Sequence, residues 1–198
     1  MAGQILNKGT ASLSSVLIRI EGALYERVER ASRHMACGKK CTKYGLGFLN
    51  EPDDPYKVQR TGLLGEAAFA IWSKLPLDLS YKPGGDHSDF VVHGKAIDVK
   101  CAYRNYEMNL IVRREFDGGK FHPLKDIYVG SYITYDFPQH WTAQVRLLGY
   151  NVRKELEKVA VTPSSRGVHL NTRLLHRDLQ PLQRLKDFID GKICYENL

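Results

Sequence analysis

The sequence predicts a mixed α/β protein in which helices pack on a central mixed β-sheet. Apolar residues recur at helical spacing in the first third of the chain, short β-rich runs follow between residues 78 and 150, and helical spacing returns near the C-terminus. The chain of 198 residues, with 43% hydrophobic and 26% charged residues, has the size and composition of one globular unit. The expected organisation is an N-terminal helix and connector, residues 1–57, packed on a core domain of residues 58–198.

Two helices are predicted before the β-rich part. Apolar residues over 14–36 recur every three or four positions, with arginine and glutamate between them. Residues 37–57 lose this period and contain glycine and proline, which predicts a connector. A second helix is expected over 61–75, where Thr61 is suited to the N-cap position.

The period then changes to the alternation that is typical of strands. Strands are expected at residues 78–83, 89–92, 95–103, 109–116, 126–135 and 143–150. A short helix is expected at 151–159 and a terminal one within 178–191.

The charge is unevenly distributed along the chain. The formal net charge is +7, yet residues 51–100 contain more acidic than basic side chains, while both ends are basic. Phosphate groups bind to cationic surfaces and divalent ions bind to carboxylates. This distribution suits a nucleic-acid enzyme with a metal site, although a solvated basic surface is the simpler alternative.

The sequence favours a protein of the cytoplasm, or of the host cytoplasm if the source is viral. No stretch approaches the roughly 20 apolar residues of a membrane span, so no membrane partner is expected. The four cysteines are too few and too scattered for a disulfide framework.

The most informative stretch is a predicted hairpin over residues 89–100. Both central residues of a type I′ turn need a positive φ, which Gly94 adopts freely and His93 tolerates. Such a turn places Asp89 directly opposite Asp98.

Lys100 belongs to the same face of this hairpin, because side chains alternate along a strand. The opposite face is apolar and is expected to point to the core; it contains Phe90, Val92, Ile97 and Val99. Two facing carboxylates destabilise the fold unless a cation lies between them. A Mg²⁺ ion held by Asp89 and Asp98 would bind a phosphate oxygen and activate a water molecule, and Mn²⁺ is expected to substitute for it. Lys100 would orient that water or neutralise the developing charge.

These residues, preceded by Gly65-Glu66 in a predicted helix, resemble the PD-(D/E)xK nuclease superfamily. The resemblance implies a restriction-endonuclease-like core, as in phage-type or resolvase-like members. It also implies that Asp89 and Asp98 are metal ligands, that Lys100 is the catalytic lysine and that Glu66 completes the metal environment. Ser88 stands where the motif has proline, and Asp86 is an alternative first ligand.

Glu66 has support of its own, because its helical neighbours are small or apolar. A carboxylate on such a surface is costly unless a cation compensates it. The alternative is a glutamate at the edge of a solvated stripe.

Basic residues on both sides of the motif could bind substrate phosphates. They are Lys39, Lys40 and Lys43 after the first helix, and Arg104, Arg113 and Arg114 after the hairpin. The lysine cluster could instead form the contact of a homodimer.

The sequence therefore predicts a magnesium-dependent nuclease that hydrolyses phosphodiester bonds, with DNA as the expected partner and RNA as a second possibility. One alternative is a nucleic-acid-binding protein that has the nuclease fold and does not cleave. Another is a structural protein in which the motif is coincidental.

Overall fold

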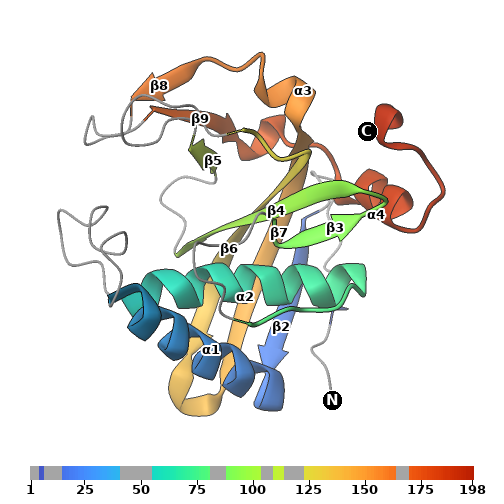
Figure 1. Ribbon diagram of the computed structural model, residues 1–198. Coiled ribbons are helices and arrows are strands. Elements are labelled where there is room, and N and C mark those ends of the chain that lie inside the picture. The colour runs from blue at the N-terminus through green and yellow to red at the C-terminus, as the bar shows by residue number, and fades with distance from the viewer. Residues whose placement is uncertain are drawn as a thin grey trace.

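A mixed six-stranded sheet forms the centre of the protein. The computed structural model describes residues 5–6, 15–40, 55–80, 88–103, 109–113, 123–163 and 170–198 (Figure 1). The strand order is β1 (Ile5–Leu6), β2 (Val16–Glu21), β7 (Thr142–Val152), β6 (Ile127–Phe137), β4 (Lys95–Tyr103) and β3 (Phe90–Val92). Only β4 and β6 are parallel, and the other neighbouring strands are antiparallel. The predicted mixed α/β class is confirmed.

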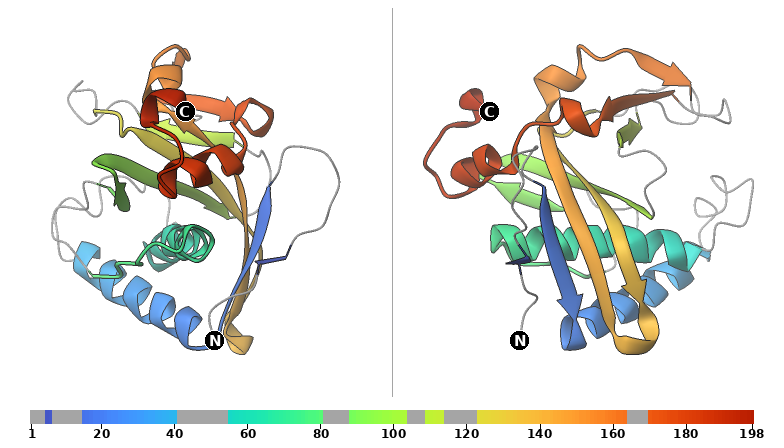
Figure 2. Two further views of the ribbon diagram at one scale, coloured as in Figure 1. Left: turned by 90° about the vertical axis from the view of Figure 1, so that its right-hand side faces the viewer. Right: turned by 180° about the vertical axis from the view of Figure 1, so that it is seen from behind.

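Two long helices cover one face of this sheet. Helix α1 (Gly22–Lys40) and helix α2 (Pro55–Ser73) lie on the same side of β2, β7 and β6 (Figure 2). The main core fills the space between them and the strands, and Phe69 of α2 packs against Phe90 of β3 with ring centroids 5.0 Å apart. We call this the inner face of the sheet. In the part of the chain that is described, no helix is long and apolar enough to cross a membrane.

A smaller layer covers part of the outer face. It consists of a three-stranded sheet, in the order β5 (Asn109–Arg113), β9 (Leu170–Leu175) and β8 (Val161–Pro163), together with α3 (Arg153–Leu156). A second core joins this layer to the central sheet and includes Leu110, Tyr128, Leu148, Leu156, Leu174 and Leu179. Helix α4 (Leu182–Ile189) packs into the main core. Three single-turn 3₁₀ segments complete the chain: η1 (Pro138–His140), η2 (His176–Asp178) and η3 (Tyr195–Asn197).

The helix predicted over 14–36 is wrong in its first part, which is strand β2. Ile18 and Ile20 are fully buried while Arg19 between them is exposed, so the segment also has the alternation of a strand. Pairing with β7 selects the strand. Gly22, at φ +57°, joins β2 to α1. The N-terminal segment therefore supplies an inner strand of the central sheet.

The other differences concern element ends, one predicted strand that does not form and strands that were not predicted. Helix α2 begins six residues before Thr61, whose hydroxyl donates to the carbonyl of Lys57 inside the helix instead of capping it. Residues 78–80 form no strand, because the Asp78 carboxylate accepts the N–H of Ser80 and competes with strand pairing. Residues 81–83 lie outside the described residues. Strands β8 and β9 had no counterpart among the predictions.

The helix predicted over 151–159 is shorter, because Asn151 and Val152 remain paired with β6. The terminal helix starts at Leu182, directly after Pro181.

Gly65 sets the distance between α2 and the sheet. A Cβ atom at this position would lie 2.6 Å from the Cβ atom of Cys101 and 3.0 Å from the hydroxyl of Ser131, which belong to β4 and β6. We expect Gly65→Ala to lower the free energy of unfolding by about 1–3 kcal/mol, because the packed layers must separate.

Gly62, one helical turn earlier, is the matched control. A Cβ atom there would meet only Glu66 Oε1, at 4.0 Å. Gly62→Ala should stabilise the helix by up to about 1 kcal/mol. Urea denaturation of both variants measures the difference, and equal effects would contradict the close packing at Gly65.

Candidate active site

The β3–β4 hairpin has the predicted turn, and its three ladder pairs have the predicted register, but the ladder ends at Phe90 and does not include the predicted pair of Asp89 with Asp98. His93 and Gly94 have φ angles of +48° and +75°, and Phe90 pairs with Ile97 across the turn. Local turn chemistry thus places the start of β3 beside the middle of β4 and brings Asp89 next to β4.

Asp89 is attached to β4 by both its main chain and its side chain. Its backbone N–H donates to the carbonyl of Ile97 at 3.1 Å, and its Oδ2 atom accepts the N–H of Val99 at 2.6 Å. The carboxylate therefore caps the end of the β3–β4 ladder and is held beside the two residues that flank Val99, which are Asp98 and Lys100.

Asp98 and Lys100 form an ion pair on the outer face of β4. Asp98 Oδ2 lies 2.5 Å from Lys100 Nζ, and 13% of the Asp98 side chain is exposed, against 44% of the Lys100 side chain. Burial alone would lower the pKa of the lysine, but the carboxylates of Asp98 and then Asp89 outweigh it and raise that pKa above its ordinary value. Lys100 is thus a protonated, solvent-accessible cation at neutral pH, and it supplies the positive charge that two neighbouring carboxylates require.

The neighbouring strand β6 continues this site. In the parallel register, Tyr128 lies beside Asp98 and Gly130 beside Lys100. The hydroxyl of Tyr128 accepts the N–H of Lys125 at 3.0 Å, which fixes the ring in the second core. The site therefore lies where the central sheet meets the layer formed by β5, β8 and β9.

Glu66 lies in a different place from the other three predicted residues. Its carboxylate is close enough to Cys101 to contribute to the raised pKa of that thiol, about 12, for which burial is the main cause. Cys101 packs against the main core on the inner face, next to Gly65, whereas Asp98 and Lys100 project from the outer face. The structure thus brings Asp89, Asp98 and Lys100 together, whereas Glu66 belongs to α2, which covers the inner face.

The predicted phosphate-binding residues are only partly within the described residues. Lys39 and Lys40 end α1, and Arg113 ends β5. Lys43, Arg104, Arg114 and the alternative ligand Asp86 lie outside the described residues.

No protein-family model, curated protein or solved structure matches this chain. The assignment of a function therefore depends on the chemistry of the site.

A divalent ion fits the two carboxylates at the hairpin. Among the described residues, no three histidine, cysteine, aspartate or glutamate side chains gather into a metal-binding group. Magnesium, however, is commonly bound through one or two carboxylates, with water and substrate phosphate as its remaining ligands. Asp98 Oδ2 is buried and pairs with the Lys100 ammonium at 2.5 Å. A divalent ion bound to this oxygen would take the place of the ammonium.

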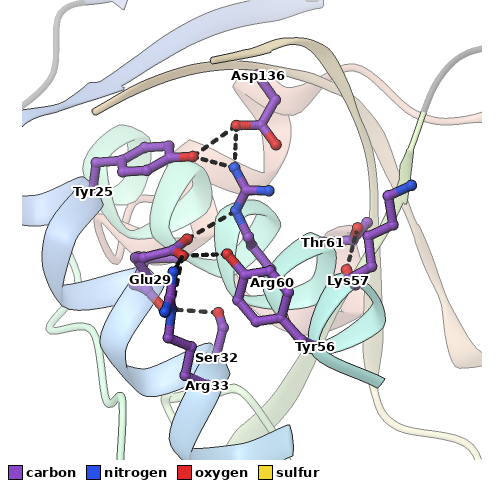
Figure 3. A network of polar contacts seen from close by, with 10 residues as sticks. Tyr25, Glu29, Ser32, Arg33, Tyr56, Lys57, Arg60, Thr61 and Asp136 are labelled. Carbon is purple, nitrogen blue, oxygen red and sulfur yellow. Dashed lines mark hydrogen bonds and ion pairs between the residues drawn. The ribbon is translucent and has the colours of Figure 1, made fainter. Parts of the chain in front are cut away.

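A second group of charged residues, which the sequence did not reveal, links α1, α2 and the end of β6 (Figure 3). Arg60 of α2 lies between two acids, with Nε 3.1 Å from Glu29 Oε2 and Nη2 2.5 Å from Asp136 Oδ1. The Tyr25 hydroxyl donates to Asp136 at 2.8 Å, and the Tyr56 hydroxyl donates to Glu29. The three charged side chains are each less than one-tenth exposed. We call this group the Arg60 network. Each buried charge in it is paired with an opposite charge, which indicates a structural role.

The tyrosines of the protein predict how its stability depends on alkaline pH. Burial, and then the hydrogen bond to Glu29, raises the pKa of Tyr56 to about 12, and burial raises that of Tyr150 to about 12. An unfolded tyrosine loses its proton near pH 10. Because the folded state holds these protons more tightly, the free energy of unfolding should fall as the pH rises from about 10 to about 12.

Chemical denaturation at a series of pH values measures this loss. The double variant Tyr56→Phe/Tyr150→Phe should show a shallower fall, since phenylalanine has no proton to lose. An unchanged slope would contradict the proposed origin of the pH dependence.

Proposed function

We propose that the protein is a magnesium-dependent nuclease that hydrolyses phosphodiester bonds in DNA. The observation that carries this proposal is the convergence of Asp89, Asp98 and Lys100 at one hairpin, with Asp98 paired to Lys100 and Asp89 held beside them. Two carboxylates and a lysine on neighbouring strands form the group expected of a PD-(D/E)xK nuclease. The mixed sheet flanked by helices is compatible with a restriction-endonuclease-like core.

In this proposal Asp89 and Asp98 hold the magnesium ion. The bound ion supplies a Lewis acid for a phosphate oxygen and lowers the pKa of a water molecule. Because Asp98 pairs with Lys100, an ion bound by Asp98 would compete with that ammonium for the carboxylate. Lys100, whose side chain is 44% exposed, would supply the positive charge that stabilises the negative charge developing on the phosphate.

Glu66 provides a test of how far the resemblance extends. If the ion is held at the hairpin by Asp89 and Asp98 alone, Glu66→Gln should retain cleavage, because Glu66 belongs to α2, which covers the inner face of the sheet. If Glu66 also contributes to the metal environment, that variant should lose most of its activity.

Incubation of the protein with supercoiled and linear DNA tests the function directly. Cleavage with Mg²⁺, none with EDTA and partial recovery with Mn²⁺ are expected. Retention of DNA without cleavage in any divalent ion would favour the alternative of a binding protein with this fold. If the protein neither binds nor cleaves DNA, both the nuclease and the binding protein are rejected.

A further inference from the structure

The outer face of the central sheet is uncovered at the end remote from the second core. Within the described ranges, no helix or strand lies over this part of β2, β7 and β6, while α1 and α2 cover the inner face (Figure 2). Three large side chains are exposed there: Tyr135 at 47%, Phe137 at 37% and His140. Large aromatic rings on an open surface indicate a binding face.

These three rings form a continuous row. The ring centroids of Tyr135 and Phe137 are 6.0 Å apart at an interplanar angle of 31°, and those of Phe137 and His140 are 4.5 Å apart at 43°. Tyr135 and Phe137 alternate along β6 with Asp136, whose side chain points inward to Arg60. The Arg60 network therefore anchors the strand on one face while its aromatic side chains remain free on the other.

Polar groups lie beside the rings in the same register. Arg19 of β2 pairs with Gln144 of β7, which pairs with Tyr135 of β6, so that one row crosses all three strands. Together with Glu21, Phe137, His140 and Thr142 they line a shallow pocket of about 500 Å³. The Arg19 side chain is 45% exposed and pairs with Glu21 at 2.8 Å, so much of its charge is balanced. The pocket thus offers stacking surfaces and hydrogen-bonding groups more than a strong cation, which suits bases better than phosphates.

The row leads along β6 to the candidate active site. Tyr132 and Tyr128 project from the outer face toward the second core, and Gly130 between them lies beside Lys100. From Gly130 to Tyr135 the strand extends for about 16 Å, at its usual rise of roughly 3.3 Å per residue, less a little for the bulge between Ile133 and Tyr135. This distance corresponds to about four to five nucleotides of a stacked strand, at roughly 3.4 Å per nucleotide.

We propose that this face, named the aromatic platform after Tyr135, Phe137 and His140, binds a single-stranded segment of the DNA substrate and leads it toward Lys100. Exposed rings stack on unpaired bases, whereas the faces of bases inside a duplex are covered by their neighbours. The formal net charge of +7 favours a polyanion over an uncharged apolar peptide as the ligand of this face. This inference rests on the proposed nuclease function and specifies its substrate.

Fluorescence anisotropy with a labelled oligothymidylate tests the platform. The measurement uses Ca²⁺ in place of Mg²⁺, so that binding is observed whether or not the protein cleaves. The full chain should bind the single strand more tightly than a duplex of equal length. Tyr135→Leu/Phe137→Leu should weaken that binding roughly 30-fold, since each lost stacking contact weakens binding by at least about fivefold.

Two control variants separate stacking from other effects. Tyr135→Phe/Phe137→Tyr keeps both rings and should bind as the wild type does. Val58→Ala removes a side chain that is 47% exposed on α2, away from the platform, and should also bind normally. Thermal unfolding of each variant verifies that it is folded.

The outcomes distinguish the platform from the nuclease function. The platform is not a site for single-stranded DNA if the leucine variant binds with unchanged affinity. The same conclusion follows if duplex and single strand bind equally, or if the protein clearly prefers oligouridylate. Cleavage in Mg²⁺ combined with any of these would leave the nuclease function intact. Ring-dependent binding of the single strand without cleavage would support the platform and reject the nuclease function.

Discussion

Asp98→Asn and Lys100→Met should each reduce DNA cleavage by at least about 100-fold, and they should differ in how they bind magnesium. The loss reflects the removal of a metal ligand in the first case and of a positive charge near the phosphate in the second. Asp98→Asn should also weaken magnesium binding. Lys100→Met should bind magnesium as tightly as the wild type or more tightly, because the ammonium that pairs with Asp98 at 2.5 Å no longer competes with the ion.

Isothermal titration calorimetry with Mg²⁺ and a cleavage assay on the same preparations measure the two effects. Lys95→Met is the matched control, because Lys95 belongs to the same strand and contacts the ring of Tyr195 instead of the acids. Near-normal cleavage by either test variant would remove the hairpin from the mechanism. Equal magnesium affinities of Asp98→Asn and the wild type would place the ion elsewhere.

Arg60→Met should lower the free energy of unfolding by about 3–5 kcal/mol, because it leaves the buried carboxylate of Asp136 without its cation and that of Glu29 with only the exposed Arg33. The Arg60 side chain is 9% exposed, and those of Glu29 and Asp136 are 7% and 3% exposed. The hydroxyl groups of Tyr25 and Tyr56 solvate the carboxylates and cannot replace the positive charge.

Two further variants test whether charge is the cause. Arg60→Met/Glu29→Gln/Asp136→Asn also removes the charges of the two carboxylates that Arg60 pairs with and should recover a large part of the lost stability. Arg33→Met affects the other arginine paired with Glu29, but its side chain is 72% exposed, so a much smaller change is expected. Equal denaturation midpoints of Arg60→Met and Arg33→Met would show that the network contributes little.

Local sequence was sufficient to predict the hairpin and its three clustered residues. The turn at His93-Gly94 needs only the conformational freedom of two residues, and alternation along β4 then places Asp98 and Lys100 on one face. Both effects act over a few residues, so no information from the rest of the chain was needed. The sequence by itself therefore determined that Asp98 meets the lysine and that Asp89 lies at the same hairpin.

Tertiary structure determined the features that depend on contacts between residues far apart in the sequence. Residues 16–21 suit a helix or a strand, and pairing with β7, more than 100 residues later, selects the strand. The position of Glu66 follows from the packing of Gly65 against Cys101 and Ser131, which local spacing does not reveal. Arg60 and Asp136 meet only after α2 docks on the end of β6, and the same folding leaves Tyr135 and Phe137 open on the other face. Helix and strand periods predict which side of an element is apolar. Which other element packs against that side depends on the packing free energy of the whole chain.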